Sequence, residues 1–198
     1  MKIVFIGDSI TDANHNYSDD TLGEGFVKIV AGKLQEKGLN IECVNKGHDG
    51  FTVHGLWRML DYDCIEKRPN ILTILIGCND ISVEKSTGKT LEEQCFKETY
   101  EKILERICQE TKAKIICMAP FIFPYPLEFQ NWIPSVRKIE IMVSDLTEKF
   151  SASFVALHDM LNASALNLGY EKITTDGIHL TENGARIVAE KWMEAAGF

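Results

Sequence analysis

The sequence predicts a three-layer α/β/α sandwich built on a five-stranded parallel sheet. Short apolar runs alternate five times with longer segments of helical spacing, and strands that alternate with helices pair in parallel. The run of residues 71–76 is apolar apart from Thr73, which is typical of a central strand covered on both faces. This succession favours the flavodoxin-like order 2-1-3-4-5 across the sheet.

Apolar spacing and helix-ending residues predict the individual elements. Residues 25–37 show helical spacing through Phe26, Val30 and Leu34, and Gly38 supplies a stop. The expected strands cover 3–6, 41–44, 71–76, 114–118 and 154–157. The expected helices cover 25–37, 53–67, 91–110, 134–150 and 182–196, with a short helix and turn at 162–170.

Polar or proline-rich composition predicts the connecting loops. Residues 12–22 and 82–89 are polar and are expected at the surface, and residues 45–52 are expected to turn after the second strand. Residues 119–126 hold three prolines among aromatics, so they cannot continue a strand. We expect that segment either to form one wall of a pocket or to pack on the core.

Size and charge limit the classes of partner. With 198 residues, 45% of them hydrophobic, the chain can bury one substantial core. No linker divides it, so residues 1–198 are expected to form a single domain. The net charge of −8, with lysines and arginines dispersed among acids, disfavours a nucleic-acid or anionic-membrane surface. A neutral or cationic small molecule fits this balance better.

Neither a targeting segment nor a metal site is expected. The apolar run after Lys2 has four residues, too short for a signal peptide, and no segment approaches the roughly 20 apolar residues of a membrane span. We therefore expect a cytoplasmic protein. Its six cysteines lack CxxC spacing and are expected to be reduced, mostly as core residues. The five histidines lack the spacing of metal ligands.

Polar residues that follow the strands form a candidate catalytic constellation. Ser9, Gly50 and Asn79 come just after the first three expected strands, so they should share the carboxyl edge of the sheet. The loop before the last helix can return Asp176 and His179 to that edge. Together they would supply a nucleophile, an imidazole base, a carboxylate and oxyanion donors.

Four sequence blocks resemble those of the SGNH, or GDSL-type, esterase family. They are Gly7 to Ile10, Asn45 to Thr52, Gly77 to Asp80 and Asp176 to His179, present in that order over nearly the whole chain. Within this family, the turn that begins at Asn45 and the residues around Ser9 and Met118 are most similar to bacterial carbohydrate esterases of the acetylxylan-esterase type.

The resemblance implies a role for each site residue. Ser9 would attack an ester carbonyl, His179 would take its proton, and Asp176 would orient the imidazole. The backbone N–H groups of Ser9 and Gly50 and the Asn79 amide would hold the oxyanion. Gly50 is preferred over Gly47 because the oxyanion glycine of the family precedes a threonine by two positions. No metal or organic cofactor is required, and an acetylated sugar or oligosaccharide is the expected substrate.

Two other functions remain open at this point. A lysophospholipase or thioesterase would need a longer acyl groove, for which Phe121, Phe123, Tyr125 and Trp132 could supply the wall. A non-catalytic module could instead bind a carbohydrate, or a phosphate at the helix start after Gly7. The sequence has no G-x-G-x-x-G fingerprint and no lysine in that turn.

Several other polar residues have simpler expected roles. His15 and His48 are alternative bases that we expect to be solvated loop histidines, and His158 is expected to be structural. Asp8 and Asp80 are expected to accept backbone N–H bonds and shape the loops.

Four further residues are left without a functional role. Cys78 has no assigned role, and Arg58 is expected at the solvated surface. Trp132 and Trp192 could lie in the core or at a contact of a homo-oligomer.

Overall fold

The computed structural model describes all 198 residues and contains one five-stranded parallel sheet of order β2-β1-β3-β4-β5. The predicted strand order and fold class are therefore confirmed. The strands are β1 (Lys2–Gly7), β2 (Glu42–Gly47), β3 (Ile71–Leu75), β4 (Lys114–Met118) and β5 (Ser153–Val155).

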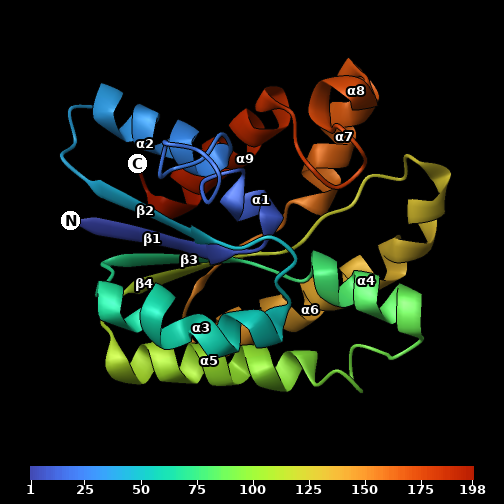
Figure 1. Ribbon diagram of the computed structural model, residues 1–198, viewed down its shortest axis with the longest axis horizontal. Coiled ribbons are helices and arrows are strands. Elements are labelled where there is room, and N and C mark those ends of the chain that lie inside the picture. Colours follow the sequence, from blue (N-terminus) through green and yellow to red (C-terminus); the bar gives the residue numbers. More distant parts are fainter.

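Helices cover both faces of this sheet (Figure 1). One face is covered by α2 (Phe26–Glu36), α7 (His158–Leu168) and α9 (Glu182–Ala196), and the other by α3 (Val53–Asp63), α5 (Phe96–Glu110) and α6 (Ile133–Lys149). Each face buries a cluster of 23 hydrophobic residues, so the two layers contribute equally to the core. The shorter elements are α1 (Ser9–Asp12), α4 (Cys78–Thr87), α8 (Tyr170–Ile173), η1 (Ile65–Lys67) and η2 (Leu127–Trp132).

Trp192 belongs to the core and not to a contact surface. Its side chain is fully buried and its Nε1–H donates to the Thr73 hydroxyl at 2.7 Å. Its ring centroid lies 5.2 Å from that of Phe5. A buried indole N–H needs an acceptor, which accounts for the one polar residue in the otherwise apolar strand β3.

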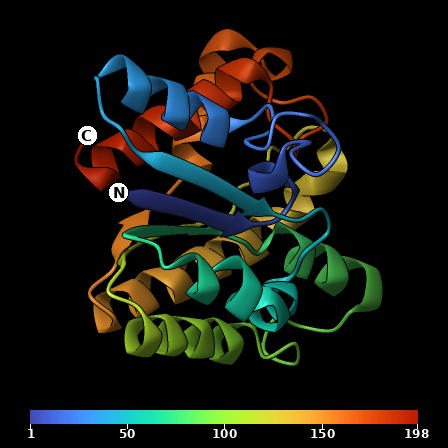
Figure 2. The ribbon, with the colours of Figure 1, turned by 60° about the vertical axis from the view of Figure 1, so that its left-hand side comes forward.

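The carboxyl ends of β1, β2 and β3 meet at one edge, where α1 lies directly beyond the arrowheads of β1 and β2 (Figure 2). The contact between α1 and the end of β2 is close because residue 47 has no side chain. A Cβ at Gly47 would lie 2.1 Å from the backbone N of Asp12. Glycine at this position therefore sets how near Ser9 can come to the loop that follows β2.

The prediction of a polar loop at residues 82–89 is wrong, because these residues continue helix α4 to Thr87. Only its first turn is buried, at Cys78, Asp80 and Ile81, so the rest carries no apolar period for sequence reasoning to detect. The hydroxyls of Ser86 and Thr87 bond to carbonyls one turn earlier, and Gly88, with φ of 76°, ends the helix.

Other boundaries differ by smaller amounts. The expected turn at 45–52 begins later, since β2 continues through Gly47. The expected helix at 91–110 begins only at Phe96, and that at 53–67 ends at Asp63 before η1. The strand expected at 154–157 ends at Val155, and the short helix expected at 162–170 begins earlier, at His158. No helix is both long enough and apolar enough to cross a lipid bilayer.

Replacing Gly47 by alanine is expected to lower the free energy of unfolding by about 3 kcal/mol, because the new methyl group would meet backbone and not a movable side chain. Urea denaturation measures the change. The matched control is Gly32→Ala in α2, where an added Cβ meets nothing within 4 Å; it should be stabilising by up to about 1 kcal/mol. Equal effects of the two variants would contradict the close-contact explanation.

Candidate active site

Three of the predicted site residues form a connected chain of hydrogen bonds. The Ser9 hydroxyl lies 3.0 Å from His179 Nε2, and His179 Nδ1 lies 2.7 Å from Asp176 Oδ2. Ser9 is the first residue of α1 and His179 precedes α9, so the contact joins residues 170 positions apart. The fold thus brings together the groups that the sequence predicted to be neighbours.

The Asp176 carboxylate is held by its own loop. Its Oδ1 accepts the backbone N–H of Ile178 at 2.9 Å and that of His179 at 2.7 Å. Partial burial raises the pKa of Asp176, but the hydrogen bonds from the His179 ring and from these two N–H groups outweigh it and lower the pKa overall. An ionised carboxylate only accepts, so Nδ1 of His179 carries the proton and Nε2 offers its lone pair to Ser9.

Each of the three residues predicted to hold the oxyanion, Ser9, Gly50 and Asn79, offers a hydrogen-bond donor. The Ser9 N–H opens α1 and has no carbonyl one turn earlier to bond. Gly50 has φ of 71°, a conformation suited to glycine, and its N–H makes no hydrogen bond within the protein. The Asn79 side-chain amide donates to the Phe51 carbonyl at 3.0 Å, which fixes the direction of its second N–H.

Asp8 and Asp80 shape the loops around these donors, as predicted. Asp8 is buried at the start of α1 and accepts the N–H of Ile10 at 3.1 Å, while Asp80 is fully buried and accepts the N–H of Val53 at 3.2 Å. Burial raises the pKa of each carboxyl to about 7.

Residues 5–187 match the model of the GDSL-like lipase/acylhydrolase family. The chain belongs to this family. It is 30% identical to an acetylxylan esterase from Geobacillus stearothermophilus, over 100% of this chain and 94% of that protein.

Solved structures agree with the family assignment. The crystal structure of the Geobacillus esterase matches with a TM-score of 0.87 and 27% identity over the same shares of the two chains. A protein classed as a GDSL-like lipase from Parabacteroides merdae matches with a TM-score of 0.90 and 27% identity, over 99% and 95%.

In this acylhydrolase a cavity of about 420 Å³ opens beside Ser9 and His179. Three carboxylates line it, from Glu24, Asp49 and Glu182, and no lysine or arginine does. Burial, and then the neighbouring Asp12 carboxyl, raise the pKa of Asp49. Sequence reasoning missed the two glutamates, which lie before α2 and at the start of α9. The only signal was that Glu182 follows His179 by three residues in the sequence.

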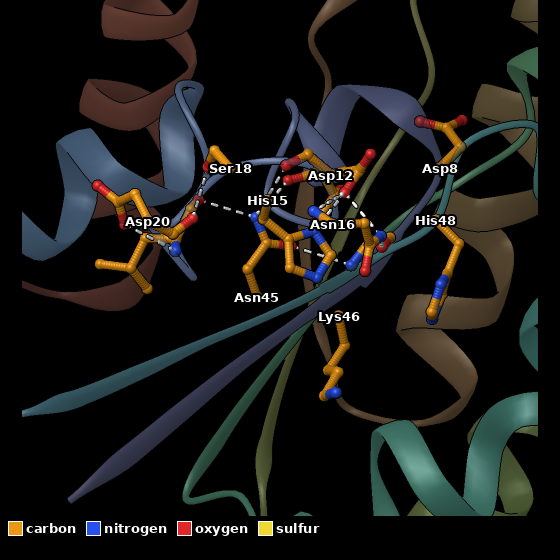
Figure 3. A network of polar contacts seen from close by, with 12 residues as sticks. Asp8, Asp12, His15, Asn16, Ser18, Asp20, Asn45, Lys46 and His48 are labelled. Carbon is orange, nitrogen blue, oxygen red and sulfur yellow. Dashed lines mark hydrogen bonds and ion pairs between the residues drawn. The ribbon is translucent and has the colours of Figure 1, made fainter.

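The prediction that His15 and His48 are solvated is wrong, because each pairs with a buried carboxylate. The His15 side chain is 9% exposed and Nδ1 contacts the fully buried Asp12, whereas His48 Nε2 lies 2.8 Å from Asp63 Oδ2. His48 points away from the group formed by Asp12, His15 and Asn16 (Figure 3). The loop expected at 12–22 therefore begins with a buried polar network, and neither histidine bonds Ser9.

The structure also places His158, Arg58 and Cys78, for which the sequence predicted no catalytic role. His158 is buried and accepts the Ile122 N–H, which confirms a structural role, and Arg58 is exposed. Cys78 is buried, and burial raises the pKa of its thiol far above the ordinary value, so it is a poor nucleophile.

Aromatic residues of the expected pocket wall do not line the cavity at Ser9. Phe121 and Phe123 are 3% and 0% exposed within the core, and Trp132 packs on Phe129. Tyr125 is exposed. Of the two alternatives left open for the loop at 119–126, packing on the core is correct for both phenylalanines.

Asp80→Asn is expected to be more stabilising at pH 8 than at pH 5. The unfolded carboxyl loses its proton near its ordinary pKa of 3.8 and the folded one near 7, so the wild type loses stability as the pH rises between these values. The free-energy advantage of Asn should grow by about 2 kcal/mol over that range. Urea unfolding at both pH values measures it, with the exposed Asp19→Asn as control; parallel behaviour of the two variants would refute it.

Proposed function

We propose that this acylhydrolase is a serine esterase that removes acetyl groups from a sugar or short oligosaccharide through an acyl-enzyme. The observation that carries the proposal is the hydrogen-bonded series from the Ser9 hydroxyl through His179 to Asp176. A hydroxyl 3.0 Å from an imidazole nitrogen that bears a lone pair has the geometry of an activated nucleophile.

The reaction proceeds in two halves. Ser9 Oγ attacks the ester carbonyl carbon while its proton moves to His179 Nε2, and the resulting tetrahedral intermediate breaks the bond to the alcohol, which leaves with that proton. Water then attacks the acyl-enzyme, giving its proton to His179, and the carboxylic acid departs as the Ser9 hydroxyl is restored. Asp176 stays ionised and stabilises the imidazolium in both halves.

The negative charge on the carbonyl oxygen would be held by the N–H groups of Ser9 and Gly50 and by the Asn79 amide. These donors gain strength as the oxygen becomes an anion, so they act mainly on the transition state. Loss of one such donor costs on the order of 10²–10³ in rate.

The relatives support the same set of residues and the acetylated-sugar substrate. Solved structures of the Geobacillus enzyme, described as an acetyl-xylooligosaccharide esterase, include catalytic mutants in which a serine, an aspartate or a histidine is replaced by alanine. The mutated aspartate and histidine stand three positions apart, as Asp176 and His179 do here.

The cavity also supports an uncharged, hydroxyl-rich substrate. Carboxylates of Glu24, Asp49 and Glu182 can accept hydrogen bonds from sugar hydroxyls, whereas they repel the phosphate of a lysophospholipid. The buried Phe121 and Phe123 are not free to form an acyl groove. A phosphate-binding module is disfavoured because the Asp8 carboxylate already occupies the start of α1.

Ser9→Ala is expected to lower kcat on p-nitrophenyl acetate by roughly 10⁴-fold or more, because the acyl-enzyme cannot form. A fluorophosphonate probe should label the wild type and not this variant. Ser18→Ala, a nearby exposed serine, serves as control and should match the wild type in rate and labelling. Full activity of Ser9→Ala would overturn the site assignment, and a wild type that neither hydrolyses esters nor is labelled would favour a binding module.

Acetyl esters should be hydrolysed faster than octanoyl esters, and acetylated xylo-oligosaccharides should release acetate. Because of the carboxylates in the cavity, kcat/KM for an anionic acetyl ester such as O-acetylsalicylate should be lower than for phenyl acetate, and Glu24→Gln should narrow that gap. Initial rates of acid release measure all of these. A preference for the octanoyl ester would replace the proposed substrate by a long-chain acyl ester.

A further inference from the structure

A second histidine–carboxylate pair, which the proposed mechanism does not use, lies beside the turn that contains Gly50. His48 follows β2 and Asp63 ends α3, and their side chains meet at 2.8 Å. The Asp63 side chain is 2% exposed and that of His48 is 24% exposed. The Lys46 ammonium lies 4.0 Å from Asp63 Oδ1.

This pair holds the turn that contains Gly50. The turn runs from His48 to Phe51, and the Phe51 N–H donates to the His48 carbonyl at 3.2 Å. The His48 ring also stacks on the Phe51 ring, with centroids 4.3 Å apart and planes inclined by 25°. The two ends of the turn are therefore joined through backbone and side chains, and the imidazole that joins them is anchored on α3 by Asp63.

The same turn orients the third oxyanion donor. The Phe51 carbonyl accepts the Asn79 side-chain amide at 3.0 Å. A displacement of Phe51 would therefore rotate the Asn79 amide. It would also move the N–H of Gly50, which is the preceding residue. Both donors that lie outside α1 depend on the position of one four-residue turn.

We propose that His48 and Asp63 are positioning residues for the oxyanion hole, an inference that rests on the proposed esterase function. Neither residue lines the cavity at Ser9, so they act through the turn and not on the substrate. Displacements of about 1 Å at catalytic groups can cost on the order of 10²-fold in rate. Asp63 reaches the turn only through His48, so without the imidazole the turn would lose its attachment to α3, and the buried Asp63 would keep only the Lys46 ammonium at 4.0 Å.

His48→Ala is expected to lower kcat on p-nitrophenyl acetate about 10–100-fold with KM changed less than about 3-fold, since oxyanion donors act mainly on the transition state. His48→Gln, whose amide can still donate to Asp63, should recover part of the loss. His54→Ala is the control, because that imidazole bonds the Gln94 carbonyl and not a residue of the turn; its kcat should stay within about 2-fold of the wild type.

A double-mutant cycle with Asn79→Ala separates positioning from a general loss of structure. Once the amide that Phe51 orients is absent, His48→Ala should cost at least about 3-fold less in kcat than in the wild type. The positioning role would be overturned if the fold-losses in kcat of His48→Ala and Asn79→Ala simply multiplied in the double variant. It would also be overturned if His48→Ala folded and kept the kcat of the wild type. If His48→Ala fails to fold, as judged by circular dichroism, Phe51→Leu removes the stacking while keeping the contact between His48 and Asp63, and it enters the same cycle.

The outcome is distinguishable from failure of the proposed function. If Ser9→Ala and Asn79→Ala lose activity while His48→Ala does not, the esterase mechanism stands and only the positioning role falls. If Ser9→Ala keeps full activity, the proposed function itself falls.

Discussion

The close contact between α1 and the end of β2 determines the geometry of the site. Gly47 lets the two backbones touch, and Asn45 joins them, because its side-chain amide donates to the Thr11 carbonyl at 2.7 Å and to the Leu22 carbonyl at 2.9 Å. Its Oδ1 accepts the Gly47 N–H at 2.9 Å. Ser9 stands at one side of this contact and the turn with Gly50 at the other, so the same packing places the proposed nucleophile and one proposed oxyanion donor.

In the proposed mechanism His179 becomes positively charged, and three carboxyl groups lie near it. Asp176 bonds its ring directly, while Asp8 and Asp49 lie close enough for His179 to lower the pKa of each carboxyl, against the larger effect of burial, which raises it. Asp8 and Asp176 also accept loop N–H groups, so the carboxyl groups that shape these loops lie beside the proposed proton acceptor.

The sheet and the residues at its edge could be predicted from the sequence because short-range signals encode them. Apolar runs mark the strands, and parallel strands must end at one edge, which brings Ser9, Gly50 and Asn79 together. Helix α4 escaped prediction because only its first turn is buried. The pairing of His48 with Asp63 could not be predicted, because it depends on which side of α3 faces the imidazole. The carboxylate next to His48 in the sequence, Asp49, is not its partner. Glu24 and Glu182 are far apart in the sequence and line the same cavity only in the folded chain.

The proposed catalytic pair of His179 and Asp176 lies at the surface, since their side chains are 48% and 51% exposed. In the proposed mechanism, any alcohol that could accept the acyl group from Ser9 therefore has to compete with water at an exposed site. An open loop of this kind favours hydrolysis over transesterification. It also lets a bulky, branched leaving group project into solvent while only its ester is held at Ser9.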